Sequence, residues 1–200
     1  MKIGIIVGSM QLESNSAKIG RHLCAQLAER GHEVFWLDLG KAPLPMWGNA
    51  CEGDDAWAAR LQSLSSELAA CHGYVIISPE YHGMVPPALK NVFMHFGSAV
   101  FGHKPAFIVG VSAGTGGAYP IAELRLSSAK NNRLCFTPEH CIVRRAGEVL
   151  NEDGANDEEA DVLTRARLGY GLAILLEYAK ALGQVRDSGV VDFERFANGM

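Results

Sequence analysis

The sequence predicts an α/β fold in which a doubly wound sheet is covered by helices. The first observation is a series of short, almost unbroken apolar runs, which is how strands buried on both faces of a parallel sheet appear. The second is that amphipathic stretches with helical spacing lie between those runs. This alternation along the chain indicates five strands joined by crossover helices.

The elements follow from these patterns in chain order. Strands are expected at residues 3–7, 34–37, 74–77 and 106–111, and a fifth at 140–144, after the turn-prone Pro138. Helices are expected at residues 16–30, 57–71, 87–97 and 157–182. The second helix carries one apolar stripe, at four-three-four-three spacing, that should face the sheet. Its members are Trp57, Leu61, Leu64, Leu68 and Cys71. The last helix starts with acidic residues, which suit the positive end of a helix dipole.

The composition is that of an ordinary globular domain and argues against several classes of function. The chain has 200 residues, of which 48% are hydrophobic, and a formal net charge of -4. That length predicts one domain over residues 1–200, and the lack of excess Lys and Arg argues against nucleic acid as a partner. The first apolar run is too short to cross a membrane and lacks the features of a signal peptide. We therefore expect a cytoplasmic protein with no membrane partner.

The five cysteines are expected to be structural thiols. Their number is odd, and their spacing contains neither a C-x-x-C pair nor another metal-binding pattern. Cys135 and Cys141 would pair only if the fold brought them together, and a reducing cytosol argues against that bond. The full set is Cys24, Cys51, Cys71, Cys135 and Cys141.

Three loops are expected to meet at one edge of the sheet. They follow the first, third and fourth strands, and the carboxyl ends of parallel strands are where open α/β sheets bind ligands. We call them the first loop (residues 8–16), the second loop (residues 78–87) and the third loop (residues 112–117).

The first loop, GSMQLESNS, leads directly into a helix and offers the groups of a phosphate site. Hydroxyls, side-chain amides and the unpaired N–H groups of the helix's first turn suit an anion. Helix capping by Ser14 or Ser16 explains the serines equally well. Glu13 would have to point away from a phosphate. The loop has neither the G-x-G-x-x-G nor the P-loop spacing. Its candidate ligands are Ser9, Gln11, Ser14, Asn15 and Ser16.

The second and third loops suit a flat ligand. In the second loop, Pro79 ends the strand, Gly83 permits an unusual backbone angle, and Pro86 with Pro87 can start the next helix. The three glycines of the third loop let a ligand approach the backbone, although a mobile turn would also use glycine. The candidate contacts are Pro79, Glu80, Tyr81, His82, Gly83, Ser112, Ala113, Gly114, Thr115, Gly116 and Gly117.

Together these motifs resemble one known family. SPEYHGMVPPALKNV is similar to the P-E-Y-N-x-S-x-P-x-x-L-K-N signature of the NADPH-dependent FMN reductases, which are flavodoxin-like and include quinone, azo-dye and chromate reductases. IIVGSMQLESNS resembles the phosphate loop of that family, and GVSAGTGG resembles its third, glycine-rich loop. The resemblance spans nearly the whole chain in the right order. It implies a three-layer sandwich whose five-stranded parallel sheet has the order 2-1-3-4-5, with helices on both faces.

The resemblance also implies an activity and a cofactor. The enzyme would pass hydride from NADPH or NADH through bound FMN to a small acceptor, such as a quinone, an azo compound, a metal oxyanion or free flavin. Ser9, Gln11, Ser14 and Ser16 would surround the FMN phosphate, residues 79–83 would line the isoalloxazine ring, and residues 112–117 would close its other edge. No side chain is required as an acid or base, because the chemistry is that of the flavin.

A homodimer or homotetramer is a further implication of the resemblance. The apolar residues of the helix at 87–97 fit such an interface, but they also fit a buried helix. They include Val92, Phe93, Met94 and Phe96.

The sequence departs from the family's pattern at several positions. Gln11 stands where the family has arginine and Ser16 where it has asparagine, so a neutral hydrogen bond replaces a charge-assisted one and FMN should be held more loosely. His82 replaces asparagine, and Met94 with His95 replaces an Asp-Trp pair. His82 is expected to be an ordinary exposed imidazole, although titration near neutrality would let it tune the flavin or a substrate.

Two other functions fit parts of the sequence. The stretch GVSAG, which contains Ser112, matches the G-x-S-x-G elbow of serine hydrolases, with His140 as the base. No acid stands convincingly between them, because Glu123 falls in a helix-like stretch and Glu139 adjoins the histidine. A flavodoxin-type electron carrier is the second alternative, although such carriers are usually more acidic.

Overall fold

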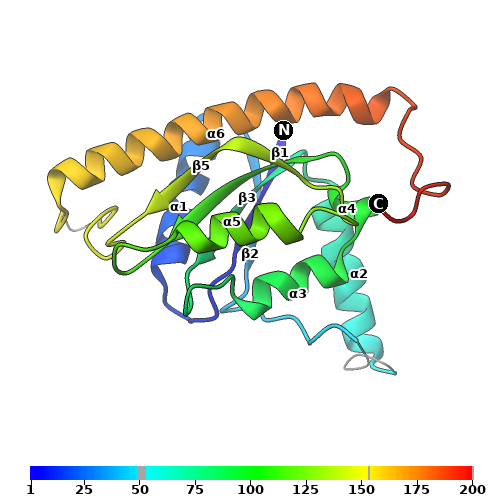
Figure 1. Ribbon diagram of the computed structural model, residues 1–200, viewed down its shortest axis with the longest axis horizontal. Coiled ribbons are helices and arrows are strands. Elements are labelled where there is room, and N and C mark those ends of the chain that lie inside the picture. The colour runs from blue at the N-terminus through cyan, green and yellow to red at the C-terminus, as the bar shows by residue number, and fades with distance from the viewer. Residues whose placement is uncertain (49–52, 153, 200) are drawn as a thin grey trace.

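The core of the computed structural model is one five-stranded parallel sheet with the strand order β2-β1-β3-β4-β5 (Figure 1). The structure describes residues 1–48, 53–152 and 154–199. The strands are β1 (Lys2–Val7), β2 (Glu33–Asp38), β3 (Gly73–Pro79), β4 (Pro105–Val111) and β5 (Cys135–Val143). The helices are α1 (Asn15–Glu29), α2 (Asp55–Ala69), α3 (Pro87–His95), α4 (Ser98–Phe101), α5 (Ala118–Ser127) and α6 (Glu158–Asp187). The expected fold class and strand order are confirmed.

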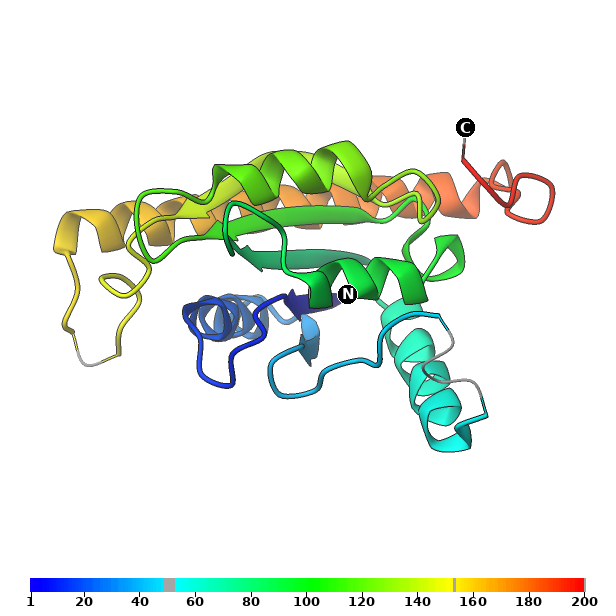
Figure 2. The same ribbon diagram turned by 60° about the horizontal axis from the view of Figure 1, so that its bottom comes forward.

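Helices cover both faces of the sheet (Figure 2). Helices α1 and α6 pack on one face, where the core includes Ile5, Val75 and Leu172. Helices α2 to α5 supply the core of the other face, which includes Ile6 and Ile76. Neighbouring residues of one strand enter different cores because side chains alternate across a strand. The apolar runs of the sequence are thus explained by strands that are covered on both sides.

The fifth strand begins earlier than the sequence predicts. β5 starts at Cys135 rather than at residue 140, and Pro138 lies inside it. Between the paired positions Ala106–Phe136 and Ile108–His140, the chain advances two residues on β4 and four on β5, so β5 bulges there. Proline has no N–H for a strand ladder, and a bulge on an edge strand is one of the few places in a sheet that tolerates it. The expectation that Pro138 precedes the strand was wrong.

The second helix uses only part of its expected apolar stripe. Leu68 and Cys71, at its C-terminal end, are buried. Trp57 is partly exposed, and the guanidinium of Arg60 lies 4.7 Å from the centre of its ring. The N-terminal half of α2 extends away from the sheet (Figure 2). Leu61 and Leu64 are partly buried and pack against the same core as Leu68 and Cys71, so of the expected stripe only Trp57 lies outside it.

The last helix starts as the sequence predicts. Asp157 is the residue before α6, and its side chain accepts the N–H of Ala160. Glu158, Glu159 and Asp161 then occupy the first turn, where their negative charges are attracted to the positive end of the helix dipole. The helix continues to Asp187, five residues beyond the expected end at residue 182.

The four cysteines that the structure describes are free thiols, namely Cys24, Cys71, Cys135 and Cys141. Burial raises the pKa of Cys24, Cys71 and Cys141 to about 11, so these thiols stay protonated and unreactive at neutral pH. Cys51 lies outside the described residues. The structural interpretation is confirmed for the described four.

Candidate cofactor site

The three loops meet at one end of the sheet, as the sequence predicts. Ser9 Oγ of the first loop lies 2.9 Å from Tyr81 Oη of the second loop. Glu80 Oε2 of the second loop accepts the N–H of Gly117, in the third loop, at 2.6 Å. Side-chain hydrogen bonds therefore join the second loop to both of its neighbours.

The first loop opens onto the N-terminus of α1. Ser14 caps this helix, because its Oγ accepts the N–H of Ala17 at 3.1 Å. The N–H groups of Asn15 and Ser16, in the first turn, have no acceptor within the helix and donate to no other described residue. The Glu13 carboxylate pairs with Lys41 at 3.2 Å, which offsets its negative charge. The helix start is thus available to an anion.

The side chains of the first loop differ in how far they reach solvent. Ser9 and Ser16 are each only 1% exposed, and the Ser9 hydroxyl is already bonded to Tyr81 and to the N–H of Gln11. Gln11 is exposed, and Ser14 is half-buried. Asn15 is half-buried like Ser14, so Gln11, Ser14, Asn15 and the N–H groups of α1 are the predicted phosphate ligands that an anion can reach without rearrangement.

The second loop forms a tight hairpin turn at its tip. The backbones of Tyr81 and Met84 exchange two hydrogen bonds, of 3.1 and 3.0 Å. The central residues, His82 and Gly83, have φ values of 52° and 75°, and positive φ at both positions is the signature of a type I′ turn. Their N–H groups donate to no described residue. Two backbone donors therefore stand free at the tip, and the His82 side chain is exposed.

Glu123 of α5 holds the far end of the second loop. Its Oε2 accepts the N–H of Val85 at 2.8 Å, and its other oxygen forms an ion pair with Lys90. Burial alone would raise the pKa of Glu123, but the hydrogen bonds from Lys90 and Val85 hold that pKa below its ordinary value. The carboxylate is thus charged at neutral pH and fixes the path of the chain into α3, which begins at Pro87 as expected.

The glycines of the third loop have different neighbours. A Cβ on Gly116 would lie 2.6 Å from Glu80 Oε1, and one on Gly117 would lie 2.6 Å from the Ile142 side chain. Protein atoms therefore explain these two glycines. Gly114 faces open space, so it is the glycine that leaves room for a ligand. The N–H groups of Ala113, Thr115 and Gly116 donate to no described residue.

A groove lies between the first and second loops. Its volume is about 430 Å³, within the range of roughly 300–1,000 Å³ for small-molecule sites. It is lined by Met10, Gln11, Glu80, Tyr81 and His82. Four of these five residues were predicted as cofactor contacts, and Met10 was not.

The serine hydrolase alternative does not fit this geometry. Ser112 Oγ accepts the N–H of Gly114 at 3.2 Å, and no described histidine is bonded to it. The residue that pairs with the end of β4 is Val143, and His140 lies three residues earlier on β5, about 10 Å along the strand. Glu123 is engaged with Val85 and Lys90. The groups of a catalytic triad are therefore not assembled around Ser112.

A family model described as NADPH-dependent FMN reductase matches residues 1–148. The chain belongs to the NADPH-dependent FMN reductase family. The reductase is 27% identical over 173 residues to an FMN-dependent NADPH-azoreductase of Staphylococcus aureus, a match that covers 84% of this chain and 90% of the relative. It is 30% identical over 128 residues to an azoreductase of the same description from Staphylococcus saprophyticus, covering 63% and 68% of the two chains.

Solved structures share the fold of the reductase. An oxidoreductase from Corynebacterium diphtheriae superposes with a TM-score of 0.67 at 15% identity, over 90% of this chain and 97% of the other. The flavoenzyme NAD(P)H:(acceptor) oxidoreductase FerB from Paracoccus denitrificans gives a TM-score of 0.66 at 22% identity, over 88% and 98%. At these identities, the likeness establishes the fold.

Family membership confirms the expected function and cofactors. The reductase is an FMN-dependent NAD(P)H oxidoreductase, so it is an enzyme rather than a flavodoxin-type carrier. The residues present fit FMN. The uncapped N–H groups at the start of α1 suit its phosphate, and the free N–H groups of the second and third loops suit the polar edge of its ring system.

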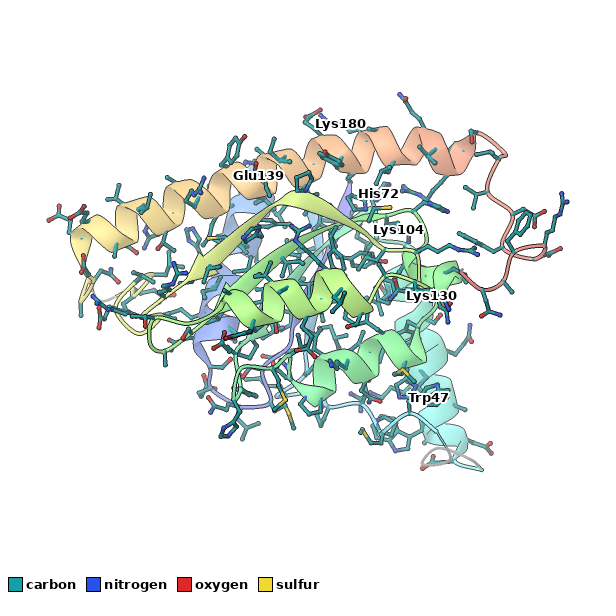
Figure 3. All side chains as sticks on the ribbon, in the orientation of Figure 1. Trp47, His72, Lys104, Lys130, Glu139 and Lys180 are labelled. Carbon is teal, nitrogen blue, oxygen red and sulfur yellow. The ribbon has the colours of Figure 1, made fainter. Side chains whose placement is uncertain are left out.

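Two arginines at this end of the sheet were not predicted as site residues. Arg144 and Arg145 directly follow β5, and Arg144 Nε donates to Thr115 O of the third loop at 2.8 Å. Their place was accessible in principle, because the strand order puts the end of β5 next to the third loop. Lys104, whose pKa is lowered to about 8 by burial, precedes β4 and lies at the other end of the sheet (Figure 3). It is not part of the site.

Proposed function

We propose that the three loops hold FMN in the groove, and that NADPH-derived electrons pass from it to small planar acceptors such as azo compounds or quinones. The observation that carries the proposal is the pair of hydrogen bonds Ser9–Tyr81 and Glu80–Gly117, at 2.9 and 2.6 Å. They join the second loop, with its aromatic side chain, to the loop that precedes the N-terminus of α1 and to the third loop with its free N–H donors. The choice of acceptor is supported by the Staphylococcus azoreductases that the chain resembles.

The protein's share in this reaction is binding and orientation. When bound, FMN would supply the redox chemistry, from hydride acceptance to delivery of electrons to the acceptor. The N–H groups of Asn15 and Ser16, with the Ser14 hydroxyl, would bind the phosphate. The free N–H groups of the second and third loops would face the polar edge of the ring, where fixed dipoles stabilise negative charge.

The part of the groove that the flavin ring leaves open would favour planar organic acceptors over metal oxyanions. Met10 and Tyr81 offer apolar and aromatic surface to a flat molecule. The Glu80 carboxylate lines the same groove, and its negative charge opposes an oxyanion. We therefore expect faster turnover with a quinone or an azo dye than with chromate.

An absorbance experiment tests the proposal. Protein incubated with excess FMN and then desalted should be yellow, with one flavin per chain. Under anaerobic conditions NADPH should bleach the flavin bands, and a quinone or azo dye should restore them without any partner protein. No quenching of flavin fluorescence when FMN is titrated with the protein, or bands that NADPH does not bleach, would remove the proposal. Steady hydrolysis of an ester that stops in Ser112→Ala would instead revive the hydrolase.

We also propose that the reductase forms a homodimer, with a homotetramer as the alternative. Of the α3 residues considered for an interface, Val92 and Phe96 are buried in the core, so they support the buried-helix interpretation. Met94 is more than half exposed, as are Met84 of the second loop and Trp47. The backbone N–H of Trp47 donates to Asn91 Oδ1 of α3. Exposed apolar side chains thus lie on α3 and on the segments before and beside it, where a second copy would cover them.

Light scattering during gel filtration measures this state directly. A mass twice that of the 21.5 kDa chain is expected, and four times that mass indicates the tetramer. Met94→Glu should lower the mass, whereas Val190→Glu, at an exposed position in the C-terminal tail, should not. A mass equal to one chain for the unaltered protein would contradict the proposal.

The cytoplasm is the location that we propose. Among the described residues, no helix has both the length and the apolar character that a bilayer crossing needs. The four described cysteines are free, as thiols are kept in the cytosol. Recovery of the protein in the cytosolic fraction would support this location, and recovery in a secreted fraction would contradict it.

A further inference from the structure

Two consecutive arginines form hydrogen bonds with the third loop. Arg144 Nε donates to Thr115 O at 2.8 Å, and Arg145 N donates to Gly114 O at 2.8 Å. The next residue, Ala146, donates its N–H to Ser112 O at 3.0 Å. These bonds reach along the loop from Ser112 to Thr115, so the arginine pair has a fixed position relative to the proposed cofactor site.

Arg145 adopts a backbone conformation that is unusual for a bulky residue. Its φ is 45°, in the left-handed region that glycine and asparagine prefer. The conformation is held by the bond to Gly114 O and by the N–H of Glu148, which donates to Arg145 O at 2.7 Å. Strained residues concentrate at functional sites, so a strained arginine at this rim points to a role for its side chain.

The arginines line a small pocket. Its volume is about 210 Å³, below the range of roughly 300–1,000 Å³ for whole small-molecule sites, so it suits one group of a larger ligand. It is lined by Thr115, Arg144, Arg145, Glu148, Val149, Asp157 and Ala160. Asp157 Oδ1 already accepts the N–H of Ala160 at 3.1 Å. Glu148 and Asp157 are both acids that oppose an anion in this pocket, and Glu148 is the one that can be neutralised without removing the cap of α6.

The arginines also supply charge that the first loop does not. Gln11 is neutral, and Lys41 is paired with Glu13. Lys18 Nζ donates to Ala146 O and Val149 O, at 2.8 and 2.7 Å. Arg144 uses only its Nε in the bond to Thr115, so its two Nη groups remain available as donors. The Arg145 side chain forms no hydrogen bond with a described residue. Planar guanidinium groups bind phosphates through paired hydrogen bonds.

We propose that Arg144 and Arg145 form a binding site for a phosphate monoester of a nucleotide held at this rim. The inference rests on the proposed function. The phosphate that we assign to it is the 2′-phosphate that distinguishes NADPH from NADH, because the proposed function places the 5′-phosphate of FMN at the start of α1. The 5′-phosphate has the same chemistry, so the test separates the two. In either case the arginines determine ligand specificity and take no part in the redox step.

Three variants and a control test the site. Arg145→Asn removes the charge but keeps a residue that tolerates positive φ. Arg144→Gln removes the second charge, and Glu148→Gln removes one opposing charge. Arg195→Gln is the matched control, because Arg195 belongs to the C-terminal tail. Figure 1 shows this tail at the end of the molecule opposite the start of α6. Thermal unfolding of each variant verifies that it is folded.

Two sets of measurements separate the two phosphates. The first is kcat/KM with NADPH and with NADH, together with calorimetric binding of adenosine 2′,5′-bisphosphate and of AMP. The second is the dissociation constants of FMN and of riboflavin, from quenching of flavin fluorescence by the apoprotein. Loss of a charge-assisted contact should weaken the phosphorylated ligand about tenfold or more. The unphosphorylated partner should change little, and Glu148→Gln should strengthen the same phosphorylated ligand.

The outcomes are distinct. A selective loss for NADPH and the bisphosphate assigns the site to the dinucleotide, and a selective loss for FMN assigns it to the cofactor. Equal ratios in Arg144→Gln, Arg145→Asn and the unaltered protein would overturn the inference while leaving the proposed function intact. Failure of the unaltered protein to bind FMN at all would instead remove the proposed function.

Discussion

Ser14 caps α1 and, in our proposal, also faces the phosphate of FMN. The two roles can be separated because Asp and Asn cap helices as well as Ser does. Ser14→Asp adds a negative charge at the proposed phosphate position, and repulsion between unit charges about 4 Å apart near a protein surface is on the order of 4 kcal/mol. We expect FMN binding to fall roughly 100-fold or more. Flavin fluorescence quenching measures the change.

The neutral Ser14→Asn is the matched control for this prediction. It should keep FMN binding close to that of the unaltered protein, because the cap is retained and no charge is added. Riboflavin, which has no phosphate, should bind all three proteins alike. Equal FMN affinity in Ser14→Asp and Ser14→Asn would mean that the phosphate lies elsewhere.

The sequence predicted which residues lie at the site but not which residues they contact there. The sequence indicated that Ser9 and Glu80 lie at one rim, because the strand ends determine that. It did not indicate that Ser9 bonds Tyr81, 72 positions away, or that Glu80 fills the space left by Gly116. Such pairings depend on side-chain geometry across loops, for which the sequence carries no periodic signal.

At the scale of one helix, two glycines of α6 should respond oppositely to the same change. A Cβ on Gly171 would overlap the ring of buried Phe107, whereas one on Gly169 has its nearest neighbour, Gln26, at 3.5 Å. Alanine favours a helix over glycine by about 1 kcal/mol. Gly169→Ala should therefore stabilise the protein by up to about 1 kcal/mol. Gly171→Ala should destabilise it by roughly 1–3 kcal/mol through overpacking.

Urea unfolding at one protein concentration measures both variants. Both variants replace glycine with alanine at nearby positions of one helix, so their effects on the entropy of the unfolded chain are the same and cancel when the two free energies of unfolding are compared. Stabilisation by both alanines would show that α6 stands further from β4 than described here.

Elements with strong periodicity were predictable with their bounds, whereas α4 was not predicted and α5 was recognised only as a helix-like stretch around Glu123. Four strands and the long helices carry apolar runs or stripes of sufficient length. α4 has only four residues, and α5 follows a glycine-rich loop with a short buried stripe of Pro120, Ile121 and Leu124. The start of β5 was misplaced because Pro138 reads as a turn residue unless the bulge is known.

For the whole molecule, the shared sheet predicts one cooperative unit. Both core layers rest on the same five strands, so neither can unfold and leave the other intact. Far-ultraviolet circular dichroism and tryptophan fluorescence should report one coincident unfolding transition. Leu68→Ala in one layer and Leu175→Ala in the other should each lower its midpoint, at a cost of about 2–5 kcal/mol.

Separate transitions for the two probes, or a variant that shifts only one of them, would contradict the single domain that we propose. The fold class was accessible from the sequence because it depends on patterns summed over many residues. The strand order was accessible only through the resemblance to the FMN reductase family. For the site, the sequence predicted only its location. Parallel strands determine where the loops meet, but not which side chain contacts which part of a ligand.

The bulge at Pro138 also affects how molecules of this protein can associate. β5 is an outer strand, and an open strand edge normally invites pairing with a strand of another molecule, which leads to aggregation. Pro138 lacks the N–H that such an added strand would need, and the bulge interrupts the regular spacing of the remaining groups. Pairing of β5 with a strand of another molecule along this edge is therefore obstructed.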